Sequence, residues 1–394
     1  MVTFDFDTPI DRRGSSCIKW DIGPKRNQEP ELIPLSIADT DFACPPQVTE
    51  AIVKRCQHPV FGYSVAPQDF FTSIIGWFEQ RHHIHFEKDW IHPGGGVVTA
   101  VSYAIQTLTS PGDQVLIQTP VYDPFPAVTQ GTGRVLVESP LISRNNTYEM
   151  DFADLERKFQ GGVRLMILCN PHNPVGRVWT REELQQLAQL CVRYHVYVVS
   201  DEIHCDFGLF GHSYTSILTF PEMHPLAVCC IAPGKSFNLA GLAVSATVIP
   251  DPEINAKMNA RFRSAWLINN NVLSIAATTA AYTCGGEWMD QQIAYLEGSS
   301  RMITERLARE APRIVPAVHE GTFLMWLNFR DFGLSGEELS RELVHTWKLG
   351  MNEGWHYGTG GEGYMRLNIG CSRQLLDTVV DRLVQMHNAH FPGK

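Results

Sequence analysis

Three polar side chains of different chemistry follow predicted buried strands in this chain. Asn173, Asp201 and Lys235 each come shortly after a short apolar run. Because the carboxyl ends of parallel strands meet at one edge of a sheet, where open α/β sheets bind ligands, we expect the three to lie close together. A single loop lysine is most often only a solvated charge. An amide, a carboxylate and an amine together predict a site for a polar small molecule.

A glycine-rich turn adds a second chemical feature. Residues 94–96 are all glycine, and they precede an apolar-periodic segment, 97–108, that predicts a helix. The free backbone N–H groups at such a helix start can cradle a phosphate. Together with a lysine and an acidic residue, this arrangement suits a pyridine aldehyde that carries a phosphate. The lysine forms a covalent link to the aldehyde, and the acid pairs with the ring nitrogen.

The elements that position these residues alternate between buried strand and helix. Thr180 predicts the start of one helix, 181–194, because Glu183 completes a capping box. Such alternation predicts a mostly parallel sheet covered by helices on both faces. The predicted helices also include 48–56 and 70–82, and the predicted strands are 115–118, 135–138, 165–169, 196–200, 226–231 and 244–249.

The rhythm changes after residue 286, which predicts a smaller α+β domain. Helical patterns at 288–311, 336–349 and 373–387 are separated by strand patterns at 322–329 and 364–369. We therefore expect three parts: an N-terminal arm and small-domain segment, 1–47, a large cofactor-binding domain, 48–286, and a small C-terminal domain, 287–394.

Composition limits the classes of function. The chain has 394 residues, a formal net charge of −10 and no apolar run long enough to cross a bilayer, so we expect neither nucleic acid nor membrane as a partner. The N-terminus lacks the apolar core of a signal peptide, which predicts a cytoplasmic protein. The ten cysteines are scattered and argue against disulfides. The histidines at 82, 83 and 85 predict a surface helix end, and no metal site is expected.

The order of the motifs resembles the fold-type I pyridoxal-phosphate enzymes of the class I/II aminotransferase superfamily. Within that group the chain is most similar to the cystathionine β-lyase and C–S lyase branch. The resemblance covers nearly the whole chain. It rests on DRRG (11–14), KWD (19–21), IADTDF (37–42), GY (62–63), PVYDPF (120–125), NPHNPVG (170–176), SDEIH (200–204), KSFNLAG (235–241) and RLNIG (366–370).

The resemblance implies a role for each residue near the cofactor ring. Lys235 would hold pyridoxal 5′-phosphate covalently and then serve as the base that removes the substrate α-proton. Asp201 would keep the ring nitrogen protonated. Asn173 would hydrogen-bond the 3′ oxygen of the ring with His204 nearby, and Tyr122 would stack on the ring.

The phosphate is expected to bind differently here from the family pattern. Hydroxyl residues are usual immediately before the lysine and two residues earlier, but this chain has Gly234 and Ala232. The phosphate must then depend on the start of the helix and on Tyr63, which resembles a tyrosine that crosses the interface of a homodimer with shared active sites. The residues at the helix start are Gly96, Val97 and Val98.

The substrate side of the site is expected to involve Arg366, Asp41 and Tyr63. Arg366 stands in an apolar strand, where a lone arginine is costly without an anionic partner, so it is the candidate clamp for the substrate carboxylate. Arg373 is the competing candidate, but its place at a helix start favours a surface role. Ser36 stands where the branch often has tryptophan, which would open space near the substrate side chain.

The leading hypothesis is a C–S lyase that acts on a cysteine S-conjugate or a cystathionine-like thioether by β-elimination. The products would be a thiol, a keto acid and ammonia. An aminotransferase would use the same residues, so sequence separates the two poorly. A non-catalytic regulatory protein that keeps the fold is a further alternative, although binding alone would not require a lysine base.

Overall fold

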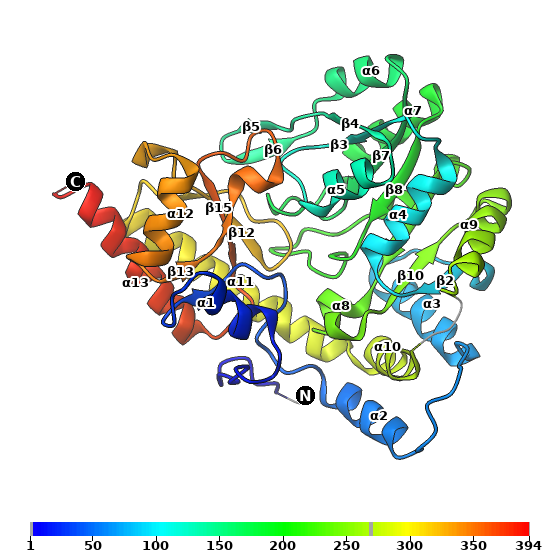
Figure 1. Cartoon of the computed structure of the whole chain (residues 1–394), viewed down its shortest axis with the longest axis horizontal. Coiled ribbons are helices and arrows are strands. Elements are labelled where there is room, and N and C mark those ends of the chain that lie inside the picture. Colours follow the sequence, from blue (N-terminus) through cyan, green and yellow to red (C-terminus); the bar gives the residue numbers. More distant parts are fainter. Residues whose placement is uncertain (1–2, 268–270, 394) are drawn as a thin grey trace.

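The computed structural model describes residues 3–267 and 271–393, and Figure 1 shows how the elements are arranged. A seven-stranded sheet runs through the larger part in the order β2-β10-β9-β8-β7-β3-β4. The four pairings from β9 to β4 are parallel, and only β10 runs antiparallel to its neighbours. This confirms the predicted mostly parallel sheet. The strands are β2 (Ile91–Gly94), β3 (Gln114–Ile117), β4 (Val135–Glu138), β7 (Val163–Cys169), β8 (Tyr197–Asp201), β9 (Ala227–Ile231) and β10 (Ser245–Val248).

Both faces of this sheet are buried, because successive strand residues enter two different apolar clusters. In β9, Cys229 belongs to one cluster and Cys230 to the other, as the alternation of side chains along a strand requires. The same division holds in β8, where Val198 and Val199 face opposite sides. Helices cover each face: α4 (Val97–Leu108), α5 (Pro124–Gly131) and α9 (Pro252–Ser264) contribute to one cluster, and α6 (Phe152–Gln160), α7 (Arg181–Tyr194) and α10 (Val272–Cys284) to the other.

Local sequence signals predicted several helix ends. The capping box of α7 is present, with the Thr180 hydroxyl accepting from Glu183 N–H and the Glu183 carboxylate accepting from Thr180 N–H. α4 and α7 match their predicted bounds, and α2 (Pro46–Cys56) and α3 (Gln68–His82) begin two residues earlier than predicted. Lys235 lies in a short helix, α8 (Pro233–Ser236), rather than in a loop.

The C-terminal part forms a second, antiparallel sheet in the order β11-β12-β15-β14. This confirms the predicted smaller α+β unit, although α12 ends four residues before the predicted helix end at 349. Its strands are β11 (Val315–Pro316), β12 (Leu324–Asn328), β14 (Asn352–Glu353) and β15 (Tyr364–Asn368). Its helices are α11 (Gly286–Glu310), α12 (Gly336–His345) and α13 (Arg373–His390).

The N-terminal segment joins this second unit rather than standing apart. β1 (Ile33–Pro34) follows the first α-helix, α1 (Gly23–Arg26), and pairs in parallel with β13 (Leu349–Gly350). From β1 the chain enters residues 36–42, which we call the strap, and then continues into α2. Across the described ranges no helix is long and apolar enough to cross a membrane.

Candidate active site

The polar residues predicted at the strand ends line one cavity of about 170 Å³. It opens beyond the carboxyl ends of β7, β8 and β9, at the edge of the sheet where ligands bind in this architecture. The structure therefore brings together residues from segments far apart in the sequence. Among the residues that line the cavity are Lys235, Asp201, Asn173, His204, Tyr122, Gly96, Val97 and Val98.

Lys235 is positioned as a reactive amine. Its Nζ donates a hydrogen bond to the backbone oxygen of Ala38 in the strap, at 2.5 Å. Burial lowers the pKa of Lys235 to about 8, and the positive charge of Arg366 contributes to the decrease. A much larger neutral fraction near neutral pH follows, and only the neutral amine can attack a carbonyl or accept a proton.

Asp201, at the end of β8, is a buried carboxyl that lacks a cationic partner. Its carboxylate accepts a hydrogen bond from Ile203 N–H at 3.1 Å, and within the described residues it forms no ion pair. Burial raises the pKa of Asp201 to about 7, although this hydrogen bond and the charge of Lys235 oppose the rise. A protonated nitrogen placed against this carboxyl would satisfy it, so the residue fits a pyridinium ring.

Two further donors point to a cofactor ring in the same cavity. His204 is buried, and its Nδ1 has no hydrogen-bond partner among the described residues. Burial holds the pKa of His204 well below its usual range, so the ring is neutral. Asn173 uses its Oδ1 to accept from Arg366, at 2.9 Å, and no described residue bonds its amide nitrogen. The unmet hydrogen-bonding capacity of these side chains supports binding of a polar ring.

Arg366, in β15, is buried, and no carboxylate of the described residues forms an ion pair with it. Its guanidinium donates to Asn173 Oδ1 at 2.9 Å, to the Ser36 backbone oxygen at 2.6 Å and to Asn352 Oδ1 at 3.0 Å. It also lies 5.2 Å from the centre of the Tyr357 ring, and its Nε has no partner in the described part of the chain. A buried cation held only by neutral oxygens has capacity for an anion, and binding of the substrate carboxylate by Arg366 stays a prediction.

The start of α4 supplies a backbone cradle at one end of the cavity. Gly96 adopts a φ of 135°, which favours glycine, and its N–H donates to the Ser245 hydroxyl at 3.0 Å. Gly234 also lines the cavity. A Cβ added there would lie 3.6 Å from the Ala240 Cα, an ordinary contact, so the missing hydroxyl residue is not forced by space.

Three predicted site residues are not part of the cavity lining: Arg366, which adjoins the cavity through Asn173, and Tyr63 and Asp41, which lie apart from it. Tyr63 stands between α2 and α3 with 95% of its surface exposed. Asp41 instead accepts from Lys19 Nζ at 2.9 Å, from Arg12 at 2.7 Å and from the Trp20 indole at 3.0 Å. Direct substrate contact by Asp41 and phosphate contact by Tyr63 both remain predictions.

Sequence reasoning missed the importance of the strap. Its backbone oxygens are held by side chains from distant segments, because irregular backbone near a buried site must find hydrogen-bond partners. Asn368 Nδ2 donates to the oxygens of residues 37 and 39, and Asn238 Nδ2 to those of residues 40 and 42. The family motif at 37–42 was the one signal in the sequence that this segment matters. The motif does not indicate that Asn238 and Asn368 bind its backbone oxygens.

The prediction for His82 was wrong in one respect. Its side chain is 8% exposed rather than on the surface, and it pairs with Asp206 at 2.8 Å with Cys205 adjacent. Its acidic and cysteine neighbours, Asp206 and Cys205, come from the loop after β8. No local pattern indicated them, because they are far from His82 in the sequence.

Comparison with known proteins places the chain among pyridoxal-phosphate proteins. Residues 30–383 match the family model described as aminotransferase class I and II. The chain is 39% identical to the cystathionine β-lyase PatB of Bacillus subtilis, over 96% of this chain and 98% of that protein.

Two crystal structures extend the likeness to three dimensions. A pyridoxal-phosphate-bound protein of Clostridium difficile 630, provisionally named an aminotransferase, has a TM-score of 0.95 and 35% identity, over 97% of this chain and 99% of that one. Cystalysin from Treponema denticola, which contains pyridoxal 5′-phosphate, has a TM-score of 0.94 and 30% identity, over 98% of both chains.

The raised pKa of Asp201 predicts how pH changes the stability of the cofactor-free protein. The folded carboxyl, with a pKa of about 7 against an ordinary 3.8, binds more protons than the unfolded one between these values. Stability is therefore lost as pH rises from about 4 to about 7. Asp201→Asn removes this loss. The difference in free energy of unfolding, variant minus wild type, should therefore rise by at most about 4 kcal/mol over that range.

Urea unfolding at several pH values measures this difference. Asp154→Asn is the control, because hydrogen bonds from Lys158 and Ser139 outweigh burial and lower the pKa of Asp154. Between about pH 4 and about pH 7 its difference from the wild type should stay nearly constant, because the pKa of this carboxyl lies below that range in both the folded and the unfolded protein. A pH-independent difference for Asp201→Asn would contradict the prediction.

Proposed function

The chain belongs to the class I and II aminotransferase family, and from this membership we propose that it is a pyridoxal-phosphate-dependent C–S lyase. Its substrate would be a cysteine S-conjugate or a cystathionine-like thioether. The observation that carries the proposal is one cavity with a lysine of lowered pKa and a buried carboxyl, adjoined by Arg366. In the described part of the chain this carboxyl has no ion-paired cation and Arg366 has no ion-paired anion. The relatives that cover nearly the whole chain include a cystathionine β-lyase and cystalysin.

The side chains present fit the cofactor. Lys235 would hold it, Asp201 would face the ring nitrogen, His204 and Asn173 the 3′ oxygen, and Tyr122 one face of the ring. When bound, pyridoxal phosphate supplies an electron-withdrawing ring that stabilises negative charge at the substrate α-carbon.

The chain's own residues then bind and orient the amino acid. Arg366 would take the substrate α-carboxylate in place of the neutral oxygens that now surround it. Lys235, neutral when released from its covalent role, would accept the α-proton. The electron pair left at the α-carbon would form a Cα–Cβ double bond as the Cβ–S bond breaks, and the thiolate would leave with the electrons of the Cβ–S bond. Water would then add to the imine form of the released enamine and displace its nitrogen as ammonia, which leaves a keto acid.

Aminotransfer is the second candidate within the same family. It needs the same lysine, acid and arginine, and one similar crystal structure carries that provisional name. The cystathionine β-lyase of 39% identity favours elimination. A regulatory protein without turnover is disfavoured, because a binding protein has no need of a lysine whose pKa is lowered toward neutrality.

The proposal extends to the assembly of the protein, its domain boundaries and its location. We propose a homodimer in which Tyr63, exposed on each copy, reaches the cofactor phosphate of the other. We also propose domain boundaries after residues 47 and 286. The pairing of β1 with β13 supports the first boundary, and the start of α11 at Gly286 supports the second. A cytoplasmic location remains part of the proposal.

Incubation with cystathionine and with an S-alkyl cysteine tests the reaction. The wild type should release free thiol, keto acid and ammonia, and it should show the near-visible absorbance of a lysine-bound cofactor. Lys235→Ala should lose both signals, because it removes the attachment point and the base. Transfer of the amino group to an added keto acid without thiol release would contradict the lyase assignment.

Gly234→Ser should strengthen binding of pyridoxal phosphate. The added Cβ would meet Ala240 at ordinary contact distances, and the new hydroxyl at the cavity wall would donate to a phosphate oxygen, which is worth up to about tenfold in dissociation constant. Equilibrium dialysis of the cofactor-free protein measures the change. Gly241→Ser is the control, because Gly241 is exposed and has open space around it. Equal affinity in the two variants would contradict this assignment of the phosphate position.

A mixing experiment tests the shared active site. Tyr63→Ala and Lys235→Ala subunits, each inactive alone, are unfolded together, refolded and assayed. In a heterodimer, one site has an intact lysine from one copy and an intact tyrosine from the other. About a quarter of the wild-type activity should therefore return after random pairing. No recovery in verified heterodimers would place Tyr63 outside the partner's site.

A further inference from the structure

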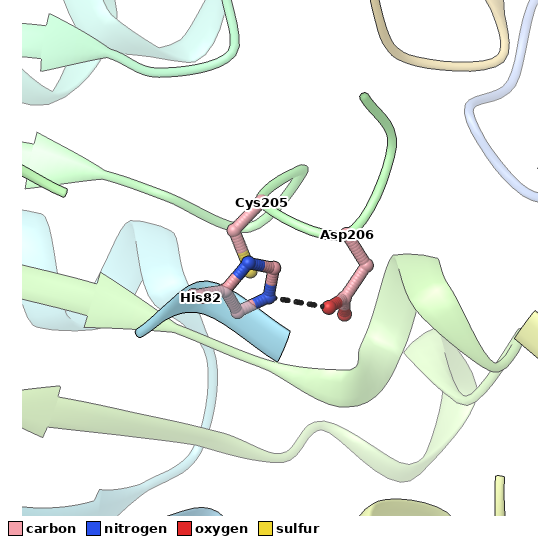
Figure 2. A group of neighbouring side chains, drawn as sticks. All are labelled: His82, Cys205 and Asp206. Carbon is pink, nitrogen blue, oxygen red and sulfur yellow. Dashed lines mark hydrogen bonds and ion pairs between the residues drawn. The ribbon is translucent and has the colours of Figure 1, made fainter. Parts of the chain in front are cut away.

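A buried carboxylate lies directly behind the helix that carries the cofactor lysine. Asp206 accepts hydrogen bonds at Oδ1 from the Trp77 indole at 2.9 Å and from His82 Nε2 at 2.8 Å. Its Oδ2 accepts from the Ser236 hydroxyl. Figure 2 shows the His82 ring of α3 directed at Asp206, with Cys205 behind it.

Asp206 is charged in spite of its burial. Burial by itself raises the pKa of Asp206, but the hydrogen bonds from His82 and Ser236 outweigh it and hold the pKa below its ordinary value. An ionised carboxylate in the core is costly unless several donors surround it. Here the donors come from α3 and α8, which are distant from Asp206 in the sequence.

The hydrogen bond from Ser236 to Asp206 connects two segments that line the cofactor cavity, the segment after β8 and the helix α8. Asp206 and His204 lie in the segment that follows Asp201 at the end of β8, whereas Ser236 is the residue after Lys235. α8 has only four residues and no side-chain cap at its start, so it is too short to be stable alone. Its orientation must be fixed from outside.

We propose that Asp206 is a positioning residue for Lys235. The carboxylate holds α8 through the Ser236 hydroxyl, and it is itself fixed by Trp77 and His82. The lysine amine is thereby held in the cavity that Asp201 and His204 also line. This inference rests on the proposed role of Lys235 as the residue that binds the cofactor.

A metal site is the competing explanation of the same group. His82, Cys205 and Asp206 offer one ligand atom each within 4.8 Å of one another. However, both oxygens of Asp206 already accept hydrogen bonds, and burial together with the charge of Asp206 raises the pKa of Cys205 well above its usual range. A carboxylate satisfied by three donors and a protonated thiol favour the hydrogen-bonded network.

A pair of serine variants tests the proposal. Ser236→Ala removes the link to Asp206, and Ser216→Ala removes an equally buried hydroxyl that donates to the carboxylate of Glu202 at 2.8 Å. Both should lower the melting temperature of the cofactor-free protein. Only Ser236→Ala should raise the dissociation constant for pyridoxal phosphate, by about fivefold, since one hydrogen bond that places the lysine is lost.

Turnover at saturating cofactor gives a second readout. It should fall in Ser236→Ala and in Asp206→Asn, whose amide cannot accept all three donors, but stay near the wild-type value in Ser216→Ala. Equal affinity and turnover in the two serine variants would overturn the inference alone. One equivalent of zinc retained by the purified protein after dialysis against a chelator would also overturn it. A wild type that forms no adduct with pyridoxal phosphate at Lys235 would instead overturn the proposed function and remove the premise.

Discussion

The strap, residues 36–42, depends on side-chain donors because it has no strand partner or helical bonds of its own. Arg366 holds the oxygen of Ser36, and Lys235 holds that of Ala38. Asn238 and Asn368 hold four more of its oxygens. Peptide oxygens buried away from water must be paired, so these contacts fix where the strap runs. Lys235 and Arg366, the two cations expected to act on cofactor and substrate, thus also donate to backbone oxygens of the strap.

A second set of charges supports the strap from its outer side. Arg12 bonds both carboxylates of the strap, Asp39 and Asp41, and Lys19 reaches Asp41 with its side chain only 1% exposed. Buried ion pairs contribute little net stability, but removal of one partner leaves an uncompensated charge. The N-terminal segment is therefore part of the active-site architecture. Its pairing with the C-terminal unit through β1 and β13 brings these charges to the correct position.

The sequence predicted that the polar residues at the strand ends would line one cavity, because parallel strands impose a common edge. Lys235, Asp201 and Asn173 converge for this reason alone. Burial on both faces also followed from continuous apolar runs. Such runs do not encode direction, so nothing indicated that β10 is antiparallel. α10, rich in alanine and threonine, lacks a strong apolar period and was not predicted. The contact between His82 and Asp206 joins segments 124 positions apart and has no local signal.

Helix α3 lies between the exposed segment that contains Tyr63 and the buried carboxylate of Asp206. The exposed segment with Tyr63 precedes it, Trp77 and His82 on it reach Asp206, and Asp206 in turn bonds the residue beside Lys235. Close-packed interiors transmit strain, so a displacement of α3 would reach the short helix of Lys235 through Asp206. The exposed segment before α3 and α8 are therefore joined by one chain of packed and hydrogen-bonded side chains.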